Sequence, residues 1–182
     1  MDAITLPDAH QIYIVIGGRN AASRLLDLAA RLALRGPLLL LDCGNRANPQ
    51  PLVRELRRLT PDPLPALNRI QAARAFTCYQ AAALLEEAAS RPVQYPVIIF
   101  DLLATFYDES VSYGEGRHLL EQCLRCMTRI RGSAPLLVSA RPPLADFPER
   151  KTFLEMLCRI SDQYWVEETP PAQPPQQLSL LS

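Results

Sequence analysis

A glycine pair, Gly17 and Gly18, follows the first strongly apolar run of the chain, in the stretch QIYIVIGGRNAASR. A strand that ends in a glycine turn and continues as a helix has the shape of a phosphate-binding loop, because the free N–H groups of the helix start face the anion. Ser23 and Arg24 are candidate nucleotide contacts together with the two glycines, and Arg19 is a further arginine within reach of a phosphate. The sequence therefore predicts a nucleotide-binding frame near the start of the chain.

The residues that would complete such a loop are missing. Counted from Gly17, the motif G-x-x-x-x-G-K-[ST] has Ala22, Ser23 and Arg24 at its last three positions. The register that starts one residue later fails in the same way, and the only lysine of the chain is Lys151. Without that lysine the loop lacks the point charge that contacts the β- and γ-phosphates. We therefore expect a degenerate loop with no ATP hydrolysis and, at most, weak nucleotide binding.

Two acidic residues stand directly after strand-like runs. Asp101 follows the run VIIF, and because an acid at a strand end is common in α/β sheets, its position alone is weak evidence for a metal. Asp42 follows the run LLLL, and we expect it to end a strand and to cap the loop behind it. Asp101 completes the set of nucleotide-site candidates.

The composition describes a single globular domain. The chain has 182 residues, of which 48% are hydrophobic and 21% are charged, enough for one sizeable core. Its net charge is +0, so no overall field attracts nucleic acid or an anionic membrane. Five cysteines without a disulfide pattern, an acidic N-terminus and no long apolar run predict a reduced, soluble, cytoplasmic protein.

Continuously apolar strands alternate with helical patterns of ten to fifteen residues. This alternation predicts an α/β fold with a mainly parallel sheet and helices on both faces. The expected strands are 11–16, 38–41, 69–75, 97–100, 135–139 and 163–166. The expected helices are 21–34, 49–59, one from a Thr77 cap to residue 90, 117–131 and 149–160. We place the domain at 1–168 and an extended, proline-rich tail at 169–182.

Three segments together resemble the core of RecA-type recombinases, closest to the archaeal and eukaryotic branch and its paralogues. They are the strand–glycine–helix stretch 11–34, the stretch RIQAARAFTCYQAAALLEEAA at 69–89, and the stretch at 96–130 that begins PVIIFDLLATFYDESVSYGEG. The resemblance implies a RecA-like P-loop NTPase fold, ATP binding between protomers and work on single-stranded DNA.

Residue by residue, the resemblance is incomplete. Asp101 matches the Walker B aspartate of the family, whereas the lysine of its Walker A motif has no counterpart. The family's water-polarising acid sits just past the second strand, and here that place reads Asp42-Cys43-Gly44-Asn45, without glutamate. Hydrolysis is therefore not expected, and RecA-like accessory proteins of bacterial mutasomes offer a suitable comparison.

The tail ends in Gln177, Leu178, Ser179, Leu180 and Leu181, which resemble the pentapeptide that binds the bacterial sliding clamp. In such a peptide the two last leucines enter an apolar pocket and the glutamine fixes the register by hydrogen bonds. The prolines before it give the peptide reach. The alternative is a tail whose leucines fold back on the domain.

Other groups of polar residues favour no metal site. Cys123 and Cys126 lie in an expected helix with His118 five residues before, but no second Cys or His pair is present to complete a zinc site. We expect both cysteines to be small buried residues of a helix face. The acidic loop 107–118 indicates protein contact or solvation and not DNA contact. The arginines 54, 57 and 58, and 125, 129 and 131, fit either phosphate contact or solvated helix faces.

These observations lead to one function and two alternatives. We expect a non-catalytic RecA-like accessory or scaffold protein in DNA repair, recombination or translesion synthesis, with no cofactor. Its expected partners are a recombinase or a repair or translesion polymerase, with the sliding clamp as a further candidate. We do not expect it to bind a membrane. The first alternative is a divergent RecA-family ATPase that acts with single-stranded DNA and uses ATP with magnesium at Asp101. The second is a sensor of a nucleotide or another regulatory ligand.

Overall fold

A six-stranded, all-parallel sheet forms the centre of the protein in a computed structural model, which describes residues 10–45, 47–108, 110–143 and 148–167. The order of the strands across the sheet is β3-β2-β4-β5-β1-β6. Their bounds are β1 Ile12–Ile16, β2 Leu38–Asp42, β3 Ile70–Arg74, β4 Val97–Phe100, β5 Leu136–Ala140 and β6 Gln163–Val166. The predicted α/β class and the predicted helices on both faces are confirmed, and the sheet is wholly parallel.

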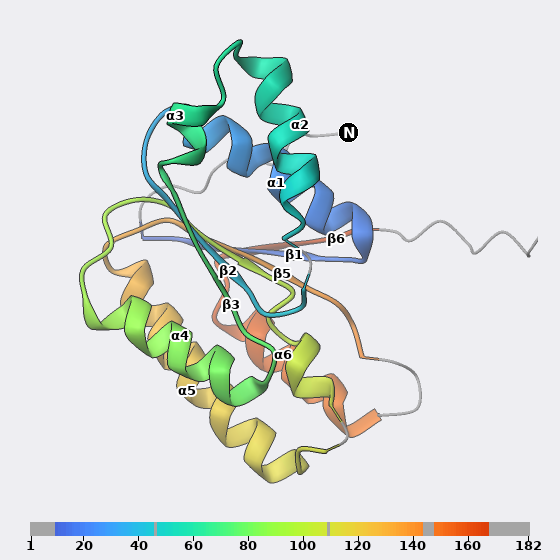
Figure 1. Cartoon of the computed structure of the whole chain (residues 1–182). Helices are drawn as coiled ribbons and strands as arrows, with labels where there is room; N and C mark the ends of the chain where they lie inside the picture. Colours follow the sequence, from blue (N-terminus) through green and yellow to red (C-terminus); the bar gives the residue numbers. More distant parts are fainter. Residues whose placement is uncertain (1–9, 46, 109, 144–147, 168–182) are drawn as a thin grey trace, which may run out of the picture.

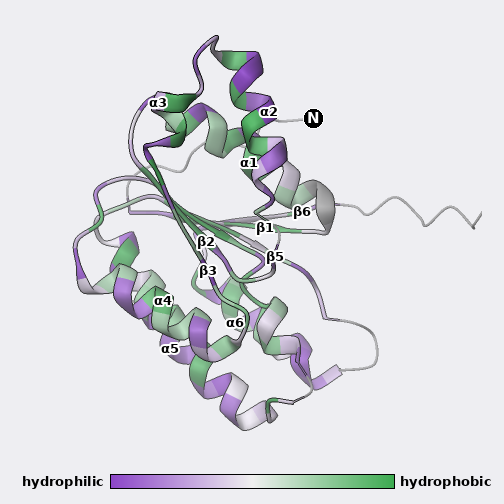
Figure 2. Ribbon diagram, in the orientation of Figure 1, coloured by the Kyte–Doolittle hydropathy of each residue, from purple (hydrophilic) through white to green (hydrophobic). Residues whose placement is uncertain are grey.

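Two layers of helices cover the sheet (Figure 1). One layer holds α1 (Arg19–Ala33), α2 (Pro49–Leu59) and the single-turn α3 (Leu64–Leu67). The other holds α4 (Cys78–Ser90), α5 (Tyr113–Arg131) and α6 (Lys151–Arg159), with 3₁₀ turns at Ala104–Tyr107 and Pro148–Arg150. Figure 2 shows hydrophobic residues along the strands and on the helix sides that face them.

The core is divided by the sheet into two parts. Alternate residues of a strand point to opposite faces, so Ile14 packs with the α4–α5–α6 layer and Val15 with the α1–α2–α3 layer. The strands β1, β4 and β5 are buried along their whole length, which is why they are almost wholly apolar, with Ser139 of β5 as the buried polar exception. Among the described residues, no helix is both long and apolar enough to span a membrane.

Several helix boundaries differ from the predicted ones. α1 begins at Arg19 with Gly18 as its N-cap, two residues before the predicted start at 21. The stretch 60–67, expected to be a loop, contains α3. α2 has the predicted bounds, and Asn48, expected in the loop before it, is its N-cap. The predicted Thr77 cap of α4 is confirmed, since its side chain accepts a hydrogen bond from the Gln80 N–H.

The start of α5 is the largest difference. Its first turn lies in a stretch expected to be loop, because glycine at two of its first four positions disfavours a helix. Ser112 overrides that tendency as the N-cap, since its side chain accepts a hydrogen bond from the Glu115 N–H. Tyr113 then stacks on Phe153 of α6, with ring centres 5.3 Å apart. Local capping and a tertiary contact therefore extend the helix by one turn.

Replacing the cap tests this explanation. We expect Ser112→Ala to lower the free energy of unfolding by about 1 kcal/mol, because one N–H of the first turn loses its acceptor. Ser112→Thr keeps the acceptor and should cost less than half as much. Urea unfolding followed by circular dichroism measures both changes. Equal stability of the alanine variant and the native chain would contradict a role of Ser112 in starting α5.

Candidate functional site

Ligands of parallel α/β sheets bind at the edge where the strands end, and the predicted nucleotide residues lie at this edge. The turn Gly17–Gly18 follows β1, Asp42 ends β2 and Asp101 follows β4. The structure brings them to one side of the sheet because all six strands run in the same direction. Ser23 lies further along α1 and is exposed. What the edge can do depends on the partners of its charged side chains.

The glycine turn is closely packed against a residue from the other end of the chain. A Cβ atom placed on Gly17 would lie 3.0 Å from the Cβ of Glu167 and 3.3 Å from that of Ala21. The Gly17 N–H donates to the carbonyl of Ala140 at the end of β5, and the Glu167 N–H donates to that of Ile16. The first amide of the turn is therefore engaged with the sheet.

Arg24, a predicted nucleotide contact, forms an ion pair. Its Nε lies 2.8 Å from Oε1 of Glu167, so a carboxylate of the protein itself stands beside the turn that a phosphate would occupy in a phosphate-binding loop. Glu167 was missed by the sequence analysis. The available signal was its position directly after the strand β6, which is the position that drew attention to Asp101.

Asp101 forms the second ion pair of this edge. Its Oδ2 lies 2.7 Å from Nε of Arg141, the first residue after the neighbouring strand β5. Its backbone is in the left-handed region, with φ 49°, and its N–H donates to Oγ of Ser139. A Cβ on Gly44 would lie only 2.4 Å from the Cβ of Asp101, so glycine is required where the loop after β2 crosses this residue. The carboxylate is buried, packed and neutralised by an arginine.

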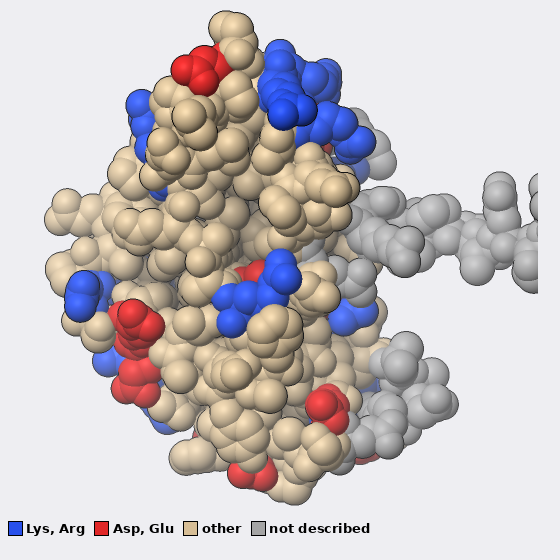
Figure 3. Space-filling model, in the orientation of Figure 1, with Lys and Arg blue, Asp and Glu red and all other residues tan. Residues whose placement is uncertain are grey.

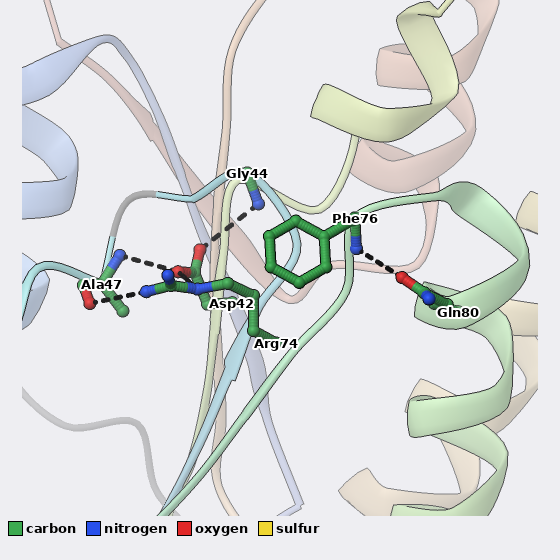
Figure 4. Close-up of polar contacts among 6 residues, drawn as sticks. All are labelled: Asp42, Gly44, Ala47, Arg74, Phe76 and Gln80. Carbon is green, nitrogen blue, oxygen red and sulfur yellow. Dashed lines mark hydrogen bonds and ion pairs between the residues drawn. The ribbon is translucent and has the colours of Figure 1, made fainter.

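Asp42 forms the third pair, at the ends of β2 and β3 (Figure 4). Its Oδ2 lies 2.9 Å from Nε of Arg74, and its two oxygens accept hydrogen bonds from the N–H groups of Gly44 and Ala47. Arg74 also donates to the carbonyl of Ala47. The prediction that Asp42 ends a strand and caps the following loop is confirmed.

An exposed aromatic ring stands next to this loop. Phe76 follows β3, its ring lies between Gly44 and Arg74 in Figure 4, and 68% of the residue is exposed. Its N–H donates to Oε1 of Gln80, which fixes the turn into α4. The Tyr79 hydroxyl, one residue into that helix, hydrogen-bonds to the Glu115 carboxylate. An apolar residue so exposed contributes nothing to the core of this chain.

A cysteine between the acids of this edge is chemically inert. Burial raises the pKa of the Cys43 thiol to about 12, and the nearby carboxylates of Asp42 and Asp101 add to the rise. The thiol is therefore protonated at neutral pH and is no nucleophile. Burial also raises the pKa of the Cys123 thiol. Cys123 and Cys126 are buried, as predicted for small residues of a helix face.

The remaining candidates take part in contacts inside the chain or lie outside the described residues. The predicted loop 107–118 includes the first turns of α5, and its contacts are with neighbouring elements. Arg150 donates to the carbonyls of Phe106 and Val111, and the hydroxyls of Tyr113 and Thr152 are 2.9 Å apart. Among the described residues, no group of three His, Cys, Asp or Glu side chains is arranged to hold a metal. The pentapeptide Gln177–Leu181 lies outside the described part of the chain.

The chain matches no family model and no curated protein with which it was compared.

The pair of Asp101 and Arg141 allows a direct test of the arrangement at the strand ends. We expect Arg141→Gln to lower the free energy of unfolding by about 3 kcal/mol, because the buried carboxylate of Asp101 loses its counter-charge. Asp101→Asn tolerates the left-handed backbone, and the double variant should recover most of the lost stability, since it leaves no unpaired charge. Urea unfolding of all four proteins measures the coupling. Additive losses would contradict a direct pair.

Proposed function

We propose that the protein is a non-catalytic RecA-like accessory or scaffold protein in DNA repair, recombination or translesion synthesis. The parallel sheet with a glycine turn after β1 and an aspartate after β4 supports a RecA-like frame. The resemblance of three segments, given above, supports the assignment to DNA transactions. In this proposal the frame serves protein–protein contacts, and no chemical step takes place on it.

The observation that carries the non-catalytic part is the set of three ion pairs at the carboxyl edge. Each acid of this edge is paired with an arginine: Asp42 with Arg74, Asp101 with Arg141 and Glu167 with Arg24. Mg²⁺ at Asp101 would have to displace Arg141, whose Nε lies 2.7 Å from the buried carboxylate. The turn offers no lysine to compensate. The residues present do not fit ATP with magnesium.

Exposed apolar side chains support a function through protein contacts. Phe76 and Tyr79 are exposed at the start of α4, and Tyr164 and Val166 are exposed on β6 at the edge of the sheet. Aromatic side chains are enriched at protein interfaces, where they add contact area at low entropic cost. The expected partners are a recombinase or a repair or translesion polymerase, and the tail is the proposed link to the sliding clamp.

The ATPase alternative is separated by calorimetry of the whole chain with ATP and Mg²⁺. We expect no binding heat and no shift of the melting temperature. A ligand that binds the folded state raises the melting temperature, so an unchanged value indicates that ATP does not bind. A matched titration without Mg²⁺ is the control. Tight, magnesium-dependent ATP binding with turnover that is lost in Asp101→Ala would overturn the non-catalytic proposal in favour of a divergent ATPase.

The clamp contact is tested with the tail. We expect Leu180→Ala together with Leu181→Ala to weaken binding of the whole chain to a bacterial sliding clamp at least tenfold, because two apolar side chains no longer enter the pocket. Replacing Pro174 and Pro175 by alanine leaves the pentapeptide intact and is the matched control. Surface plasmon resonance measures all three proteins. Unchanged binding after deletion of residues 176–182 would contradict the clamp contact. The scaffold proposal would then depend on the other expected partners.

A further inference from the structure

The two helical layers differ in charge. α1 and α2 contain six arginines and two acids, whereas α4 and α5 on the opposite face contain four arginines and four acids. Figure 3 shows positive side chains gathered over α2. The net charge of +0 therefore results from an uneven distribution, in which one face carries an excess of positive charge.

Four arginines make up what we call the α1–α2 arginine face: Arg31, Arg54, Arg57 and Arg58. All four are exposed. The three on α2 are spaced three and four residues apart, which places them on one side of the helix within one turn. Arg31 reaches the same region from α1, which packs against α2.

A single buried acid holds two of these arginines in place. Oε2 of Glu55 lies 2.7 Å from Nη1 of Arg58, and its Oε1 lies 3.8 Å from Nη2 of Arg31. One carboxylate therefore orients two guanidinium groups from different helices and neutralises only one of them. Arg54 and Arg57 take no part in this pair. The face therefore keeps a clear excess of positive charge, with two of its four guanidinium groups oriented by Glu55.

The surface beside the arginines is hollowed. A depression of about 480 Å³ is lined by Pro49, Gln50, Val53, Arg54 and Arg57. No acid is among the residues that line it, and the exposed acids of this layer lie on other segments. Asp27 is on α1, and Asp62 follows α2 with its Oδ1 accepting a hydrogen bond from the Leu64 N–H. A negatively charged group can therefore approach Arg54 and Arg57 without meeting a carboxylate of the depression.

We propose that the α1–α2 arginine face binds the phosphate backbone of duplex DNA without reading its sequence. Guanidinium groups bind phosphate oxygens in pairs and are weakly hydrated, which suits them to this contact better than ammonium groups. The sequences of α1 and α2 contain no aromatic residue to stack on an unpaired base, so the face favours a duplex over a single strand. The inference goes beyond the proposed scaffold function, which depends on protein contacts.

The test measures binding of the whole chain to a fluorescent duplex of random sequence. The salt concentration is varied from about 25 to about 200 mM, a range over which phosphate contacts weaken strongly. We expect affinity to fall with salt, and Arg54→Gln with Arg57→Gln to lower the slope of log K against log salt by about 2, because two phosphate contacts are lost. These two positions leave the Glu55 pairs intact, so folding is preserved. Arg125→Gln with Arg129→Gln removes the same charge from α5 and should leave the slope nearly unchanged.

Four outcomes would overturn the inference. The first two are salt-independent or absent binding by the native chain and equal loss of slope in the α2 and α5 variants. The third is displacement of the duplex by polyglutamate as readily as by unlabelled duplex, which would assign the face to an acidic protein. The fourth is tighter binding of a single strand than of the duplex. Clamp binding is read separately, so failure of this test leaves the scaffold proposal standing.

Discussion

Ion pairs hold the carboxyl edge of this sheet together. Each joins a carboxylate at the end of one strand to an arginine of a neighbouring element. A parallel sheet that is buried on both faces brings all its strand ends to one edge, where backbone and side-chain polar groups must find partners. In this chain Arg74, Arg141 and Arg24 supply the partners of Asp42, Asp101 and Glu167. The edge that serves as a ligand site in many α/β proteins is here stabilised from within.

The pairing also explains why the loops of this edge have the shape they do. Asp42 gathers the amides of Gly44 and Ala47, and the loop so formed passes over Asp101 at a distance that only glycine permits. Arginine is suited to the task because its planar group bonds a carboxylate and a carbonyl at once, as Arg74 does with Asp42 and Ala47. Charge neutralisation and loop geometry are therefore one arrangement.

Much of the fold was predictable from the sequence because burial on both faces leaves a simple pattern. The strands β1 and β4 are continuously apolar, and β2 and β5 contain one polar residue each, Asp42 and Ser139. Thr77 marks the start of α4 by a side chain that acts locally. The start of α5 was not predictable in the same way. It depends on the stacking of Tyr113 on Phe153, which are 40 residues apart in the chain, so that a local reading sees only the helix-breaking glycines.

The sequence identified two acids of the candidate site but not the partners of these acids, and the reason is physical. The sequence marks Asp42 and Asp101 because an acid after an apolar run is a local pattern. Their partners depend on which strands are neighbours: Arg141 meets Asp101 because β5 lies beside β4, and Glu167 meets the glycine turn because β6 lies beside β1. Strand order is a property of the whole fold, and no periodicity of one segment encodes it.

The place of β1 in the sheet has a consequence for how the chain reaches its native state. Among the described strands, β1 pairs only with β5 and β6. Its backbone hydrogen bonds, such as those at the register pair Ile12 and Leu136, therefore form only after residues more than 120 positions later in the chain have been synthesised. During synthesis an unbroken apolar segment therefore leaves the ribosome long before its neighbours exist. Closing such distant contacts is slow and leaves strand edges exposed meanwhile. β1 can enter the sheet only after β5 and β6 have been synthesised. A chain truncated before β5 lacks both strands that pair with β1.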